Sequence, residues 1–120
     1  MSEPTDNILF TGRLAASETF YIEVPIRDGR VGLQIAWPDA VSSAAITLEL
    51  TSFLSVSATV AGAGRHWKDS GVSITGPAAS AEGSSVVNVA NVLQRRARLK
   101  IITAAVTFLE ILDGLERKAA

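Results

Sequence analysis

The sequence contains no cysteine and a single histidine, and aromatic residues make up only 6% of it. The lack of cysteine excludes a disulfide framework, thiolate metal sites and a cysteine nucleophile. A histidine-based metal site at His66 would have to be completed by carboxylates alone, and acidic residues are not clustered around it at ligand spacing. We therefore predict no metal site and no cofactor.

An excess of one charge and long apolar runs are also missing. Basic and acidic residues number 11 and 12, so a net charge of −1 provides no global field for nucleic acid or an anionic membrane. The most apolar stretch, 101–112, is too short for a membrane-spanning helix and contains Glu110. The acidic start, 1–6, lacks the apolar run of a secretory signal. We expect a soluble protein without a membrane partner that does not use the general secretion route.

Apolar residues, 48% of the chain, recur at every second position in much of the sequence. Five runs show this alternation, namely 20–26, 31–37, 46–50, 54–60 and 96–101. A period of two is typical of a strand with one buried and one solvated face. The run 106–113 breaks the phase, which indicates a strand buried on both sides or a bulge near Phe108.

Turn signals separate these runs, and the strongest is Asp28-Gly29. An Asp-Gly pair readily adopts the positive φ angles of a two-residue hairpin, so we predict that strands 20–27 and 30–37 pair. The whole pattern predicts an all-β, two-sheet β-sandwich, jelly-roll-like, of about eight or nine short antiparallel strands, with a closed barrel as the second choice. We assign 8–120 to this single domain and interpret the polar residues 1–7 as a flexible N-terminal arm.

The search for catalytic patterns yields no positive signal. A Ser-His-Asp arrangement would depend on His66 alone, and no serine stands in a nucleophile-elbow context. The segment Gly62-Ala63-Gly64 lacks the third glycine of a dinucleotide fingerprint. We predict that the protein is not an enzyme and has no catalytic residues, and that His66 lies in a loop or an interface.

A basic stripe and two tryptophans have both structural and functional interpretations. Arg96, Arg98 and Lys100 share one side of a strand, either as a ribbon for an acidic partner or as a solvated face that prevents edge pairing. Nucleic acid is the weaker functional interpretation because no aromatic residues interleave with the arginines. Trp37 ends an inward-facing series and is assigned to the core. Trp67 stands among charged residues, either as a binding hot spot or folded back over an open end of the sandwich.

The chain from Ile46 onward resembles a known family in the order of its segments. The strands 46–50 and 54–60 precede the turn 67–71, a Gly/Ser-containing loop at 75–85, a Val-rich strand, the basic strand 96–101 and a last strand ending at Asp113-Gly114. This order resembles the small jelly-roll structural proteins of tailed-phage virions, especially capsid decoration (cement) proteins. It also resembles carbohydrate-binding sandwich modules and fibre-tip domains, although the sequence is poor in the aromatic residues that such modules present.

The phage resemblance implies a non-enzymatic protein that is made in the host cytoplasm, binds the major capsid protein at the virion surface and stabilises the shell. It also implies self-association, as a homodimer or homotrimer. The residues that we expect at the partner or oligomer interface are Arg65, His66, Trp67, Arg96, Arg98 and Lys100. If the protein instead binds a glycan, the expected contacts are Tyr21, His66 and Trp67.

Overall fold

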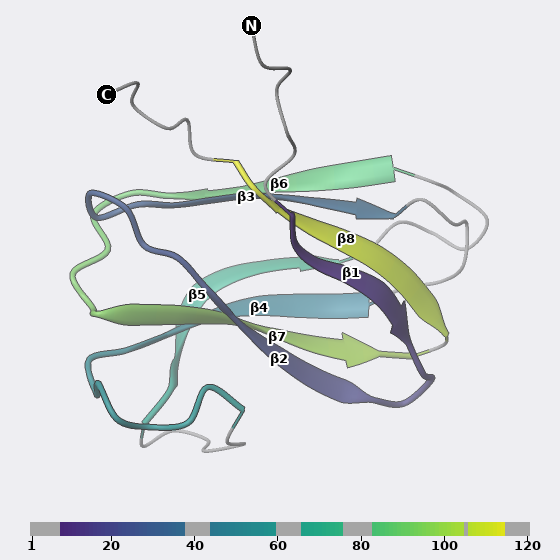
Figure 1. The fold of residues 1–120 in the computed structure, drawn as a ribbon, viewed down its shortest axis with the longest axis horizontal. Coiled ribbons are helices and arrows are strands. Elements are labelled where there is room, and N and C mark those ends of the chain that lie inside the picture. Colours follow the sequence, from purple (N-terminus) through teal and green to yellow (C-terminus); the bar gives the residue numbers. More distant parts are fainter. Residues whose placement is uncertain (1–7, 38–43, 60–65, 76–82, 105, 115–120) are drawn as a thin grey trace, which may run out of the picture.

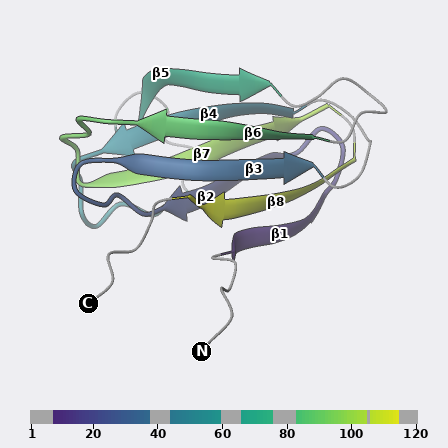
Figure 2. The same cartoon turned by 90° about the horizontal axis from the view of Figure 1, so that it is seen from above.

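A computed structural model describes residues 8–37, 44–59, 66–75, 83–104 and 106–114, and its elements are eight strands in two sheets (Figures 1 and 2). The strands are β1 (Ile8–Leu14), β2 (Thr19–Val24), β3 (Val31–Trp37), β4 (Ala44–Thr51), β5 (Lys68–Thr75), β6 (Gly83–Val89), β7 (Arg96–Thr103) and β8 (Thr107–Asp113). All pairings are antiparallel, with the orders β1-β8-β3-β6 and β2-β7-β4-β5. The predicted all-β sandwich is confirmed.

The chain passes repeatedly from one sheet to the other. Only β4 and β5 are consecutive strands that pair with each other; every other connection between consecutive strands changes sheet. This alternation is the arrangement of a double-sheet jelly roll. The β2–β3, β4–β5 and β6–β7 connections gather at one end of the sandwich, on the left in Figure 1.

The core lies between the sheets and consists of aliphatic side chains. On β7, Ala97, Leu99 and Ile101 are fully buried, and the alternate residues point to the outer face. The remaining core residues are Leu14, Val24, Val31, Leu33, Ile35, Ala44, Ile46, Leu48, Val87, Val92, Leu109 and Ile111. Burying each large aliphatic side chain contributes about 1.5–3 kcal/mol, so these layers hold the two sheets together.

The Asp28-Gly29 turn is confirmed, but the strand pairing inferred from it is wrong. The backbone groups of Arg27 and Arg30 exchange two hydrogen bonds of 2.9 Å, and φ is +52° at Asp28 and +70° at Gly29. Beyond this bridge the chains diverge: β2 pairs with β7, whereas β3 pairs with β6 and β8. The turn therefore carries the chain between sheets instead of closing a hairpin.

The runs 54–60 and 106–113 differ in the structure from the predictions made for them. The described part of the run 54–60 is not a strand, because residues 52–59 follow the end of β4 as an irregular loop. In β8, buried residues alternate with half-buried ones, so one face of the strand is buried and the other, which carries Phe108 and Leu112, is half-buried; the predicted burial of both faces is wrong. The register shift lies in the partner strand β1, between Ile8 and Phe10, and Phe108 remains in register with Arg13.

Several expectations concern residues that the structure does not describe. The proposed arm 1–7, the glycine segment 62–64 and Arg65 lie outside the described residues, as does the side chain of Trp37. Within the described part of the chain, no helix is long and apolar enough to cross a membrane.

Candidate functional site

The basic stripe of β7 lies on the outer face of the β2-β7-β4-β5 sheet. Because Ala97 and Leu99 face the core, Arg96, Arg98 and Lys100 point away from it, which confirms that the three share one side. The described parts of the connection between β4 and β5 lie over this outer face. We call residues 52–59 and 66–67, the described parts of that connection, the outer loop.

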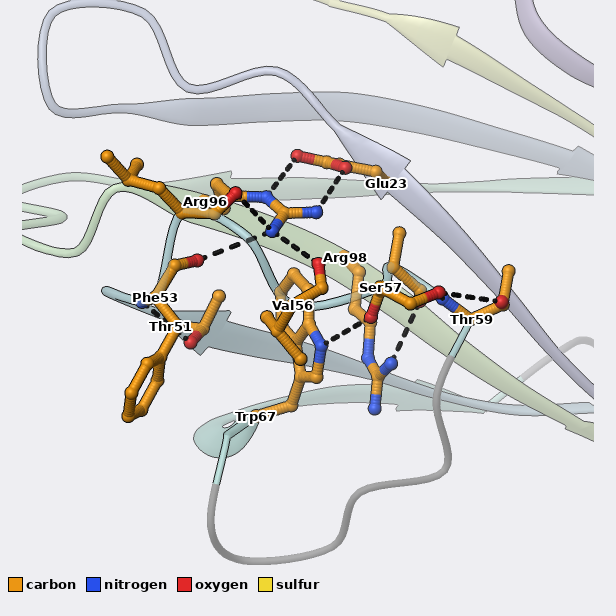
Figure 3. Close-up of polar contacts among 11 residues, drawn as sticks. Glu23, Thr51, Phe53, Val56, Ser57, Thr59, Trp67, Arg96 and Arg98 are labelled. Carbon is orange, nitrogen blue, oxygen red and sulfur yellow. Dashed lines mark hydrogen bonds and ion pairs between the residues drawn. The ribbon is translucent and has the colours of Figure 1, made fainter.

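The side chain of Arg96 binds the backbone of the outer loop. Its Nε and Nη2 atoms donate to the two carboxylate oxygens of Glu23 on β2, both at 2.9 Å (Figure 3). Its Nη1 atom donates to the carbonyl oxygens of Phe53, Leu54 and Val56 at 3.3, 3.2 and 2.6 Å. The loop's carbonyls are thus satisfied by a side chain instead of a neighbouring strand. The hydrogen bond from Arg96 also lowers the pKa of the Glu23 carboxyl group, against a smaller opposing effect of burial.

Arg98 is the most deeply placed member of the stripe, with 1% of its surface exposed. Its Nε and Nη2 atoms lie 2.8 Å from Oε1 of Glu49, and its Nη1 atom donates to the carbonyl of Ala58 at 2.8 Å. The guanidinium carbon lies 4.1 Å from the ring centroid of Tyr21 and 4.5 Å from that of Trp67. Charge-assisted hydrogen bonds and cation–π contacts both strengthen when water is excluded, so Arg98 stabilises the outer loop from beneath.

The ring of Trp67, from the outer loop, contacts the guanidinium groups of Arg96 and Arg98. It is 1% exposed, and its Nε1 atom donates to the carbonyl of Ser57 at 3.1 Å. Of the two interpretations of Trp67, the structure shows the folded-back one, although the ring covers the outer face of a sheet and not an open end. Figure 3 shows the indole nitrogen directed at the carbonyl oxygen of Ser57.

The residues predicted at an interface therefore have different accessibilities. Arg96, Arg98 and Trp67 are brought together, but Arg98 and Trp67 are buried within the chain. Lys100 and His66 are half-buried, and Arg65 is outside the described residues. Their role toward a partner remains a prediction, and a continuous exposed ribbon of positive charge is not present.

Sequence reasoning missed an apolar surface at the loop end. Phe53, Leu54 and Leu93 are 52%, 65% and 86% exposed, and we call these three residues the apolar tip. One backbone hydrogen bond joins the two loops that carry them: the N–H of Arg95 donates to the carbonyl oxygen of Thr51 at 3.1 Å. The alternation in 54–60 places Leu54 on the apolar face of a strand, and no local signal distinguishes it from a core residue.

A pocket of about 460 Å³ opens beside the tip, between the outer loop and the start of β5. Its walls include Phe53, His66, Lys68, Asp69, Ser70 and Gln94. The rings of Phe53 and His66 meet edge to face, with centroids 5.0 Å apart. Among the described residues, no group of three or more His, Cys, Asp or Glu side chains is placed to hold a metal ion.

Comparisons with protein-family models, curated proteins and solved structures gave no match to this chain.

Proposed function

We propose that this protein is a non-enzymatic structural component of a virus particle, a capsid decoration protein that binds the shell and stabilises it. The observation that carries the proposal is the apolar tip, three large side chains exposed on loops that are fixed to the body of the sandwich. The partner is the major capsid protein, and the surface that meets it is the loop end.

The tip has the character of a protein-binding surface. Large apolar side chains exposed together are unfavourable in water, and burying them against a partner supplies the main driving force of association. Polar residues adjoin the tip: Gln94 lines a pocket together with Phe53, and Arg95 donates its backbone N–H to Thr51. An apolar centre with a polar rim is the usual anatomy of a protein interface.

The rigidity of the outer loop also supports this function. Arg96 donates to three of its carbonyls, and Arg98 and Trp67 each hold one more. Loops that are already ordered lose little conformational entropy on binding, so more of the contact energy appears as affinity. The jelly roll itself recurs in viral capsid and lectin domains, which supports the proposal by analogy of fold.

The test uses particles released by a culture that carries the gene. We expect tryptic peptides of this chain in purified particles. Particles from a strain that lacks the gene should release their genome at a lower temperature, and added wild-type protein should restore the higher one. The double substitution Leu54→Asp with Leu93→Asp should weaken rebinding at least about tenfold, which corresponds to about 1.4 kcal/mol.

A matched control is Val106→Asp, which places the same charge at another exposed apolar position, in the β7–β8 connection at the opposite end of the sandwich. It should rebind like the wild type. Absence of the chain from purified particles would contradict the proposal, and so would equal rebinding by the folded double variant.

A further inference from the structure

We propose that the pocket beside the apolar tip binds a neutral saccharide. The proposal does not rest on the capsid function, although Phe53 belongs both to the apolar tip and to the wall of this cavity of about 460 Å³ between the outer loop and β5. Cavities of roughly 300–1,000 Å³ accommodate small organic ligands, which are recognised by an apolar wall and a few placed polar groups. The pocket beside the tip has both components.

The apolar component is the ring of Phe53 with Leu50 near it. Phe53 is 52% exposed, so its ring is available to a ligand, and His66 supports it edge to face at 5.0 Å. The C–H groups on one face of a sugar ring can pack against the face of an aromatic ring, because that face carries partial negative charge. Arg96 donates to the backbone carbonyl of Phe53, which fixes the backbone that carries the ring.

The polar component comes from the start of β5 and from the β6–β7 connection. Oδ1 of Asp69 accepts the backbone N–H of Gly71 at 2.7 Å, and Oγ of Ser70 accepts that of Val72 at 3.2 Å. These local bonds orient both side chains at the pocket wall. The amide of Gln94, from the other side, can both donate and accept.

The balance of charge selects a neutral ligand. The residues that line the pocket include one carboxylate, that of Asp69, and one ammonium, that of Lys68, and their formal charges cancel. An anion would meet Asp69 and a cation would meet Lys68, so neither gains a net attraction. A sugar hydroxyl both donates and accepts, and it can therefore use the carboxylate of Asp69 and the amide of Gln94 at once.

The site differs from the glycan contacts expected from the sequence. Trp67 is 1% exposed, and the ring of Tyr21 lies against Arg98. Of the three residues expected, only His66 lines the pocket. Phe53 takes the aromatic role that the sequence had suggested for Trp67.

The experiment begins with the full chain on a glycan array that carries neutral and acidic glycans. Titration calorimetry with the strongest neutral saccharide then compares the wild type with Phe53→Ala and Asp69→Asn. Asp69→Asn keeps an oxygen that can accept the N–H of Gly71 while removing the negative charge. We expect each substitution to weaken binding about tenfold, as for the loss of a contact worth about 1.4 kcal/mol.

Two further variants make the result specific to the pocket. Gln94→Ala should weaken binding without altering the aromatic wall, and it keeps the test decisive if Phe53→Ala does not fold. Leu93→Ala alters the adjacent exposed residue, which does not line the pocket, and should leave affinity within about twofold.

Three results would overturn the proposal. The first is the absence of glycan binding by protein that far-UV circular dichroism shows to be folded. The second is binding restricted to acidic glycans and abolished by salt, which would indicate attraction to Lys68 alone. The third is unchanged affinity in Phe53→Ala and Gln94→Ala.

Discussion

At the scale of single residues, Arg96 and Arg98 perform related tasks in different environments. The side chain of Arg96 is 16% exposed and pairs with the 42% exposed carboxylate of Glu23, where water screens the attraction. Arg98 is buried, and its partner Glu49 has a side chain only 12% exposed. A buried pair costs much in desolvation, and removing one partner leaves the other charge without compensation. Arg98 should therefore matter more to stability than its neighbour on the same face.

We expect Arg98→Met to lower the free energy of unfolding by about 3–5 kcal/mol, because Glu49 then remains buried without its partner. Urea unfolding followed by far-UV circular dichroism measures the loss. Lys100→Met, on the same face of β7 but half-buried, is the control and should change stability by no more than about 0.5 kcal/mol. Adding Glu49→Leu to the first variant should recover part of the loss. Equal urea midpoints for Arg98→Met and wild type would contradict this account.

At the scale of elements, the Asp28-Gly29 turn shows how one backbone conformation directs the chain from sheet to sheet. Gly29 has φ of +70°, and its carbonyl accepts the N–H of Val92 at 2.8 Å, which joins the β2–β3 and β6–β7 connections. A Cβ at Gly29 would lie 3.5 Å from the carbonyl oxygen of Val92, an ordinary contact. The backbone angle, and not crowding, therefore makes glycine favourable here.

We expect Gly29→Ala to destabilise the protein by about 1–2 kcal/mol, the cost of a left-handed conformation for an ordinary residue. Gly29→Asn should cost less, because asparagine tolerates positive φ. Thermal unfolding of the two variants beside the wild type measures the difference. If alanine and asparagine lowered the melting temperature equally, side-chain volume and not the backbone angle would be the cause.

The elements also show what the sequence could predict. Period two located the strands around 20–26, 31–37, 46–50 and 96–101, because alternation is a local property of a strand with one buried face. The choice of neighbours was not predictable at Asp28-Gly29, since it depends on how the two sheets close over the core. The run 54–60 alternates as well, yet its carbonyls are bound by arginines about 40 residues later in the chain.

The candidate site was predictable to a similar extent. Spacing alone placed Arg96, Arg98 and Lys100 on one face, and the structure agrees. Their burial was not predictable, because it arises from a loop that is distant in sequence and folds over them. The exposure of Leu54 and the pocket around Phe53 follow from the same loop. The exposure of Leu54 and the pocket can therefore be recognised only from the tertiary structure.

At the scale of the whole molecule, the two sheets present different outer faces. On the β2-β7-β4-β5 sheet, the outer loop covers Arg98. On the β1-β8-β3-β6 sheet, the strand registers place Ile8 opposite Leu112, Leu112 opposite Gln34, and Gln34 opposite Val86. None of these four residues carries a charge, and Ile8 and Val86 are 50% and 58% exposed. An uncharged row can meet its own copy about a two-fold axis, or a different surface of the next chain about a three-fold axis.

We predict that the purified protein is a homodimer or homotrimer that uses this outer face. Light scattering after size-exclusion chromatography should give two or three times the mass of one chain. Val86→Glu should reduce it to the mass of one chain, because the interface would bury the new carboxylate without a partner. Ile102→Glu changes a 44% exposed apolar residue on the outer face of the other sheet and should leave the mass unchanged. A monomeric wild type, or a Val86→Glu variant of undiminished mass, would show that this face does not mediate self-association.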